Sequence, residues 1–156
     1  MSTFSPELLK GQVCFITGGS RGGMLLEIAK EFVAHGAKAV VLMARNKDKL
    51  EEVTKEVGAK CHWEQGDVSK IESCRAAVQN VVDKFGQVDV LVNGAAGNFL
   101  ATAEKISTNG VKRVLDIDTV GTFNMSQCVF KQSMKARKRG VIINISASLH
   151  WNGSWA

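Results

Sequence analysis

The sequence predicts an α/β fold in which a doubly wound parallel sheet is covered by helices on both faces. Two observations support this prediction: short, almost continuously apolar runs alternate with segments of helical periodicity, and glycines follow several of those segments. Strands that are buried on both faces need apolar residues at nearly every position, which is typical of parallel sheets. Right-handed crossovers between such strands then produce a doubly wound sheet.

Five segments are expected to form the strands. They are residues 13–16, 39–43, 60–63, 88–92 and 141–145, of which the third is the least apolar. We expect parallel pairing in the order 3-2-1-4-5, with the turn after the first strand and Asn93 at the same carboxyl edge. Ligand sites in open α/β sheets lie at that edge, where the strand order reverses.

Helices are expected between these strands. Apolar residues recur at helical spacing from Leu25 to Val33, and further helical patterns cover residues 47–57, 71–85 and 111–137. The 156 residues, with 45% hydrophobic and 22% charged content, are typical of one soluble globular domain over residues 1–156. No apolar run is long enough to span a membrane, and the first ten residues lack a secretion signal, so we expect a protein that is neither membrane-bound nor secreted.

The net charge of +5 raises the question of nucleic-acid binding. The main basic cluster is Lys131, Lys135, Arg137, Lys138 and Arg139, and cations near the end of a helix explain it without any nucleic acid. No nucleic-acid-binding motif accompanies the cluster, so no such partner is expected. The four cysteines are scattered without metal-ligand spacing, which favours a reducing compartment and no metal site.

A glycine-rich segment lies between the first strand and the first helix. It reads Thr17-Gly18-Gly19-Ser20-Arg21-Gly22-Gly23. Glycines at this place let backbone N–H groups and the helix N-terminus approach a pyrophosphate, so these residues are candidate dinucleotide ligands. The alternative is a tight turn without a ligand.

The residue after the second strand indicates which dinucleotide is bound. An acidic residue there would bind the ribose of NAD, whereas arginine suits the 2′-phosphate of NADP. The segment 42–46 contains no acid and ends in Arg45 and Asn46, and Arg21 offers a second cation. We therefore expect NADP, with an exposed surface cation as the alternative role of Arg45.

Three ordered motifs resemble those of the short-chain dehydrogenase/reductase family. They are Thr17-Gly18-x-x-x-Gly22, Gly66-Asp67-Val68 and Asn93-x-Ala95-Ala96-Gly97, and the resemblance runs from about residue 9 to residue 148. It implies a Rossmann-type dinucleotide-binding domain of an oxidoreductase. Asp67 and Val68 match the residues that hold adenine, and Asn93 and Ala95 match the segment beside the nicotinamide.

Within this family the segments 91–100 and 116–124 are similar to the peroxisomal 2,4-dienoyl-CoA reductases. That resemblance implies NADPH-dependent reduction of an acyl-CoA substrate during fatty-acid breakdown and a homo-oligomer in the complete protein. It also implies a peroxisomal location, with a cytoplasmic one as the alternative. Phe99 matches an aromatic residue lining the acyl-CoA site, and Ser107 lies where substrate contacts are expected.

Asp118 replaces the asparagine of the family's Asn-x-x-Gly motif, as it does in the dienoyl reductases. The resemblance implies that this carboxylate belongs to the proton path to the substrate. A buried carboxylate in a cofactor cleft would have a raised pKa and could serve as an acid or a relay. The alternative is a helix carboxylate bonded to the backbone or to a neighbouring lysine.

The sequence departs from the family pattern at two positions and at its end. Met24 stands where a third glycine normally permits close packing of the helix on the strand, so Met24 is expected to displace a neighbour or to shift the helix. Ala147 stands at the usual catalytic serine, which the dienoyl reductases also lack. The lysine-bearing helix and later strands are not found before Ala156, so we expect a sheet incomplete on its C-terminal side and a fragment without turnover.

Two other functions remain open on the sequence alone. One is reduction of a trans-2-enoyl-CoA or a 3-oxoacyl thioester by a related enzyme of the same family. The other is a truncated module that binds a nucleotide or a partner without catalysis.

Overall fold

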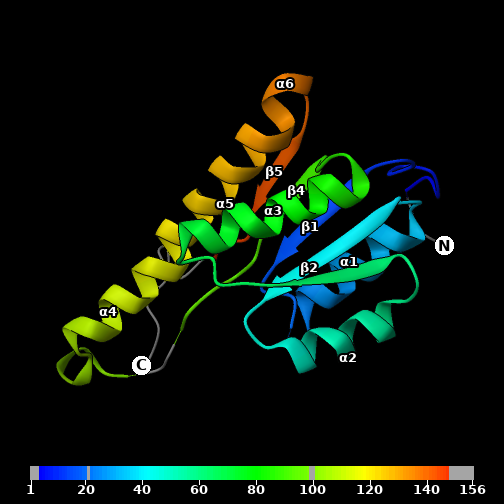
Figure 1. The fold of residues 1–156 in the computed structure, drawn as a ribbon. Helices are drawn as coiled ribbons and strands as arrows, with labels where there is room; N and C mark the ends of the chain where they lie inside the picture. The colour runs from blue at the N-terminus through cyan, green and yellow to red at the C-terminus, as the bar shows by residue number, and fades with distance from the viewer. Residues whose placement is uncertain (1–3, 21, 99–100, 148–156) are drawn as a thin grey trace.

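A computed structural model describes residues 4–20, 22–98 and 101–147, and its centre is a five-stranded parallel sheet (Figure 1). The strands are β1 (Val13–Thr17), β2 (Ala39–Ala44), β3 (Cys61–Gln65), β4 (Val90–Asn93) and β5 (Val141–Asn144). Their order is β3-β2-β1-β4-β5, and every adjacent pair is parallel. The predicted fold class, strand order and parallel pairing are therefore confirmed.

Three helices connect the first four strands, and a long helical segment precedes β5. The connecting helices are α1 (Met24–Ala34), α2 (Lys47–Val57) and α3 (Ile71–Phe85). A short 3₁₀ turn, η1 (Ala103–Lys105), leads to the long segment, which is made of α4 (Thr108–Leu115), η2 (Asp116–Val120), α5 (Gly121–Val129), η3 (Phe130–Met134) and α6 (Lys135–Arg137). The segments η2 and η3 of the long helix are π-helical turns. The hydrophobic periodicity of the sequence did not reveal them, because a single π-helical turn changes the spacing of apolar residues very little.

The core has two layers, one on each face of the sheet. Side chains alternate along each strand, so Phe15 and Val41 face the α3 and α5 side while Ile16 and Leu42 face the α1 and α2 side. All five residues of β1 are buried. This arrangement explains the continuous apolar runs of the inner strands, because neither face of those strands meets water.

A buried carboxylate ties the base of the sheet to the end of the long helix. Asp89 is 3% exposed and accepts hydrogen bonds from the backbone N–H of Val13 (2.8 Å), from Gln87 Nε2 (2.7 Å) and from Arg137 Nη2. Burial disfavours the charged form, but these donors outweigh it and the pKa of Asp89 lies below its usual value. Arg137 of the basic cluster therefore has a structural role in holding α6.

Candidate nucleotide-binding site

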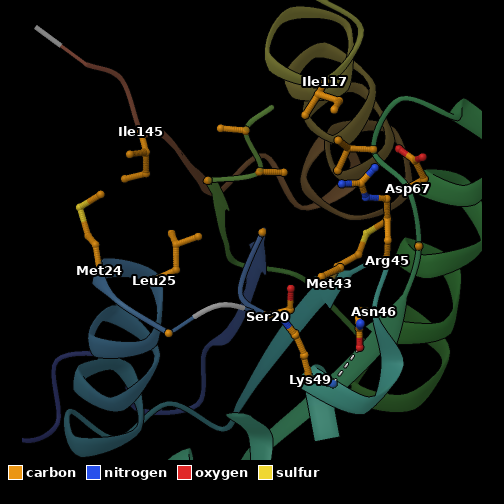
Figure 2. A pocket seen from close by; sticks show the side chains of 18 residues that line it. Ser20, Met24, Leu25, Met43, Arg45, Asn46, Lys49, Asp67, Ile117 and Ile145 are labelled. Atoms are coloured by element: carbon orange, nitrogen blue, oxygen red, sulfur yellow. Dashed lines mark hydrogen bonds between the residues drawn. The ribbon is translucent and has the colours of Figure 1, made fainter. Parts of the chain in front are cut away.

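A cavity of about 810 Å³ opens at the carboxyl edge of the sheet, where β1 lies between β2 and β4 (Figure 2). This is the edge at which the sequence predicted a ligand. Its wall is formed by the glycine-rich loop, the end of β2, and the loops that follow β3 and β4. The residues that line it are Gly18, Ser20, Gly22, Met24, Leu25, Met43, Ala44, Arg45, Asn46, Lys49, Gly66, Asp67, Val68, Gly94, Ala95, Ala96, Ile117 and Ile145.

The glycine-rich loop has a backbone that only glycine adopts readily. Gly18 has φ +87°, and a Cβ built there would lie 2.7 Å from the carbonyl oxygen of Gly94. Gly22 and Gly23 also have positive φ, and Gly23 directly precedes the first residue of α1. The loop therefore brings bare backbone and a helix N-terminus to the cavity, which is the arrangement that binds a pyrophosphate.

The loop after β4 is fastened to the end of β1. Thr17 Oγ1 accepts hydrogen bonds from the backbone N–H groups of Gly94 and Ala95, both at 3.2 Å. Asn93 is 4% exposed and donates from Nδ2 to Ser126 Oγ (3.0 Å) and to Asn144 Oδ1 (2.9 Å). Asn93 thus supports the site from behind by joining β4, α5 and β5, and it does not line the cavity.

One end of the cavity is polar and carries cations (Figure 2). Arg45 leaves the end of β2 and extends along the cavity toward Asp67. Asn46 is the N-cap of α2, and its Oδ1 accepts a hydrogen bond from the backbone N–H of Lys49 at 3.0 Å. Arg45, Lys49 and the N-terminus of α2 all border this part of the cavity, and each favours an anionic group such as a phosphate.

The loop after β3 presents an ionised carboxylate to the same end. Asp67 Oδ1 accepts hydrogen bonds from the backbone N–H (3.0 Å) and Oγ (2.7 Å) of Ser69. Partial burial raises the pKa of Asp67, but the Ser69 bonds, together with the positive charges of Arg113 and Arg45, lower it further than burial raises it. The result is a carboxylate that stays charged and can accept a hydrogen bond from a ligand.

Val68 is held in the cavity wall by the long helix. Asn124 Nδ2 donates to the carbonyl oxygen of Val68 at 3.0 Å, and a Cβ at Gly121 would lie 2.6 Å from Val68 Cγ2. Gly121, the glycine of the family's Asn-x-x-Gly motif, therefore permits α5 to approach this loop closely. This contact positions the apolar side chain of Val68 beside the cavity, where the resemblance places adenine.

The other end of the cavity is apolar, and Met24 belongs to it. Met24 is 60% exposed, and in Figure 2 it lies with Leu25 on the side of the cavity nearest Ile145. The side chain of Met24 points outward from the first turn of α1, so no neighbour has to move for it, and a shift of the helix stays a prediction. The bulk of Met24 lies in the cavity wall instead.

The structure brings eight of the predicted cofactor residues together in the cavity wall: Gly18, Ser20, Gly22, Arg45, Asn46, Asp67, Val68 and Ala95. Gly19 faces the core instead, where a Cβ would lie 2.9 Å from the side chain of Leu42. Arg21 and Phe99 lie outside the described residues. Ser107 is the N-cap of α4 and accepts a hydrogen bond from the backbone N–H of Gly110 at 3.0 Å.

Asp118 is exposed and lies in the π-helical turn η2 rather than in the cavity wall. Its Oδ1 accepts a hydrogen bond from the backbone N–H of Gly97 at 2.7 Å. A helix carboxylate bonded to the backbone was the alternative to a role in proton transfer. The bond joins the long helix to the loop after β4. A role of Asp118 in proton transfer stays a prediction.

Sequence reasoning missed several residues of the wall, above all Lys49, Ile117 and Ile145. A signal existed for Lys49, which stands three residues after the capping Asn46 and so belongs to the first turn of α2. No local signal existed for Ile117 or Ile145, because they reach the cavity from the long helix and from beyond β5.

Thiol or metal chemistry finds no support in the part of the chain that the structure describes. All four cysteines are buried, and burial raises the pKa of Cys14 to about 12 and that of Cys61 to about 11. Across the described ranges no group of three or more metal-ligating side chains was found, and no described helix is long and apolar enough to cross a membrane.

The family model for short chain dehydrogenases matches residues 12–154, so this chain belongs to the short-chain dehydrogenase family, whose members are oxidoreductases. A peroxisomal 2,4-dienoyl-CoA reductase of Arabidopsis thaliana is 43% identical over 99% of this chain and 54% of its own length. A protein of the same name from Danio rerio is 41% identical over 96% of this chain and 50% of its own length. The chain therefore spans about half the length of the curated relatives it matches.

Solved structures agree with this assignment. An NAD⁺-bound xylitol dehydrogenase has a TM-score of 0.86 and 28% identity, covering 94% of this chain and 57% of its own. A variant actinorhodin polyketide ketoreductase, solved with NADPH, has the same TM-score and identity, covering 92% of this chain and 56% of its own. These two structures of the same fold thus hold nicotinamide dinucleotides of both kinds.

Proposed function

We propose that this chain forms the dinucleotide-binding part of an NADP-dependent reductase. The observation that carries the proposal is the polar end of the cavity, where Arg45 and Lys49 lie at the N-terminus of α2 and no described carboxylate follows β2 directly. A 2′-phosphate fits this place because it would interact with two cations and with the helix dipole. The free ribose of NAD would find no carboxylate there to accept the hydrogen bonds of its hydroxyl groups.

The other residues of the cavity fit the rest of such a cofactor. The backbone of the glycine-rich loop would hold the pyrophosphate, and Asp67 and Val68 would hold the adenine by a hydrogen bond and by apolar contact. The apolar end, with Leu25 and Ile145, would shield the nicotinamide from water. When bound, this cofactor supplies hydride transfer, while the chain supplies binding, orientation and electrostatics.

The test is titration of the chain with NADP⁺ and NAD⁺, followed by the same titrations with Arg45→Ala. A hydrogen bond to a charged group contributes about 1.5–3 kcal/mol, so Arg45→Ala should weaken NADP⁺ binding roughly 10- to 100-fold and leave NAD⁺ binding nearly unchanged. Lys38→Ala is a matched control, because Lys38 is an exposed cation that does not line the cavity. Equal affinities for NADP⁺ and NAD⁺ in the unmutated chain would contradict the proposal.

For the complete enzyme we propose reduction of 2,4-dienoyl-CoA esters in the peroxisome. The support is that the relatives are 2,4-dienoyl-CoA reductases by name, together with Asp118 and Ala147 at the two positions where the dienoyl branch departs from the family pattern. The chain by itself is expected to show no turnover, because it aligns with about half of each relative. An acyl-CoA partner and a homo-oligomeric complete protein are part of the same proposal.

A further inference from the structure

The carboxylate of Asp67 is approached by guanidinium groups from two elements that are far apart in the sequence. Arg113 of α4 places Nη2 at 3.7 Å from Asp67 Oδ2. Arg45, at the end of β2, extends toward the same carboxylate along the cavity (Figure 2). Arg45 belongs to the cavity wall, whereas Arg113 approaches from outside it, so the two cations need not have the same role.

The rest of the Asp67 loop is already fixed without Arg113. The backbone N–H of Asp67 donates to Ser73 Oγ at 3.0 Å, Ser69 occupies Oδ1, and Asn124 binds the next carbonyl group. Only the Oδ2 side of the carboxylate faces Arg113. Arg113 is therefore placed to control the orientation of one oxygen atom rather than the path of the loop.

Helix α4 has few packing contacts of its own, so the ion pair between Arg113 and Asp67 is a main contact between α4 and the loop after β3. None of the side chains of α4 is buried, and Figure 1 shows α4 extending beyond the edge of the sheet. The side chains of Arg113 and Asp67 are 47% and 26% exposed, and exposed ion pairs add little to the stability of a fold. An effect of Arg113 is thus expected on ligand binding at Asp67 and on the local motion of α4.

We propose that Arg113 is a positioning residue that determines base specificity in the dinucleotide site. This inference rests on the proposed function, in which adenine lies beside Asp67. From outside the cavity the guanidinium binds Oδ2 and so fixes the plane of the Asp67 carboxylate, which lines the cavity and there accepts a hydrogen bond from the exocyclic amino group of adenine. A base that presents a carbonyl oxygen at the same place, such as hypoxanthine, meets a fixed negative charge and is rejected.

The experiment compares the affinity of the 156-residue chain for NADP⁺ and for nicotinamide hypoxanthine dinucleotide phosphate. The variants are Arg113→Met, which keeps the length of the side chain without its charge, and Arg113→Lys, which keeps the charge. Arg75→Met is the matched control, because Arg75 forms an exposed helical ion pair with Glu72 at 2.6 Å and does not line this cavity. Calorimetry gives the ratio of the two dissociation constants for each variant.

The unmutated chain should bind the adenine form more tightly. Arg113→Met should reduce that preference about two- to fivefold, the range expected for a partly exposed ion pair, while Arg113→Lys should restore part of it and Arg75→Met should not change it. An unchanged ratio, or equal weakening of both ligands, would overturn the inference. If the unmutated chain bound neither dinucleotide, the proposed function itself would fail.

A second measurement needs no ligand. Hydrogen exchange of the α4 amides should be faster in Arg113→Met than in Arg75→Met, because the ion pair joins α4 to the loop after β3. Equal exchange in the two variants would show that Arg113 does not hold α4 near Asp67, and it would overturn the inference independently of any binding result.

Discussion

Strands β1 and β5 have similar apolar sequences, but their surroundings are opposite. The five residues of β1 are all buried, whereas the four residues of β5 are all exposed, with Val141 at 55% and Ile142 at 38%. β1 lies between two strands with helices over both faces, and β5 pairs with β4 alone among the described strands (Figure 1). Burial is therefore decided by the position of a strand in the sheet and not by its composition.

The carboxyl ends of these strands also differ in their roles. The glycine-rich loop that follows β1 contributes Gly18, Ser20 and Gly22 to the cavity wall, while the segment that follows β5 contributes Ile145. β5 is held by its pairing with β4 and by the hydrogen bond between Asn93 and Asn144. The half of the cavity near β1 should therefore be more rigid than the half near β5. Substitutions around β1 and β4 should accordingly reduce the free energy of unfolding more than substitutions in β5.

The largest effect is expected at Asp89, which links the base of β1 to the long helix that precedes β5. Asp89→Ala removes a buried acceptor and leaves Arg137 without its carboxylate, which should reduce the free energy of unfolding by about 3–5 kcal/mol. Urea denaturation measures this loss. Asp83→Ala, at an exposed position of α3, is the control and should change stability by less than about 0.5 kcal/mol.

The same variant changes how stability depends on pH. Because the pKa of Asp89 is lower in the folded chain than in the unfolded chain, its contribution is present above the unfolded pKa of about 3.9 and is lost as pH falls through the lower folded value. When the pH falls below about 4, the free energy of unfolding should therefore decrease less in Asp89→Ala than in the unmutated chain. If the free energy of unfolding decreased equally with falling pH in the two proteins, a lowered pKa of Asp89 in the folded chain would be contradicted.

A matched pair of substitutions tests the comparison of the inner and outer strands. Leu91 and Ile142 are direct partners in the register of β4 and β5, but Leu91 is fully buried and Ile142 is not. Leu91→Ala should cost about 2–5 kcal/mol of stability, and Ile142→Ala should cost less than about 1 kcal/mol. Equal losses would mean that β5 is covered in solution.

The smallest effect on stability is expected at Met24, at the apolar end of the cavity. Met24→Ala should change the free energy of unfolding by no more than about 0.5 kcal/mol, because the side chain is mostly exposed and alanine is a good helix former. Dinucleotide binding should become tighter, since the substitution opens the wall near the nicotinamide end. Weaker binding after this change would indicate that Met24 contacts the ligand favourably.

Much of the fold could be predicted because it depends on local patterns. Apolar runs and helical periodicity predicted the type of nearly every element, the handedness of crossovers predicted a doubly wound sheet, and the expected strand order with a ligand site at the point of reversal is confirmed in its order. Predicted boundaries differed by a few residues, as at β4, which begins at Val90 rather than at residue 88. Asp89 still bonds through its backbone to Val13 and to Val141, but the register of paired residues begins at Val90, so the observed start of the strand differs from the predicted one by only one or two residues.

The candidate site was predictable only where its residues follow strand ends. The glycine-rich loop and Arg45 stand directly after a strand and Asp67 stands two residues after one, so the sequence by itself determined that they meet at one edge of a parallel sheet. Tertiary structure alone decided which side chains face one another there. Arg113 reaches Asp67, Met24 turns outward, and Asp118 bonds to the backbone of Gly97. These outcomes depend on the path of the long helix through its π-helical turns. They also depend on packing between segments that are far apart in the sequence, and a local pattern of apolar residues carries no information on either.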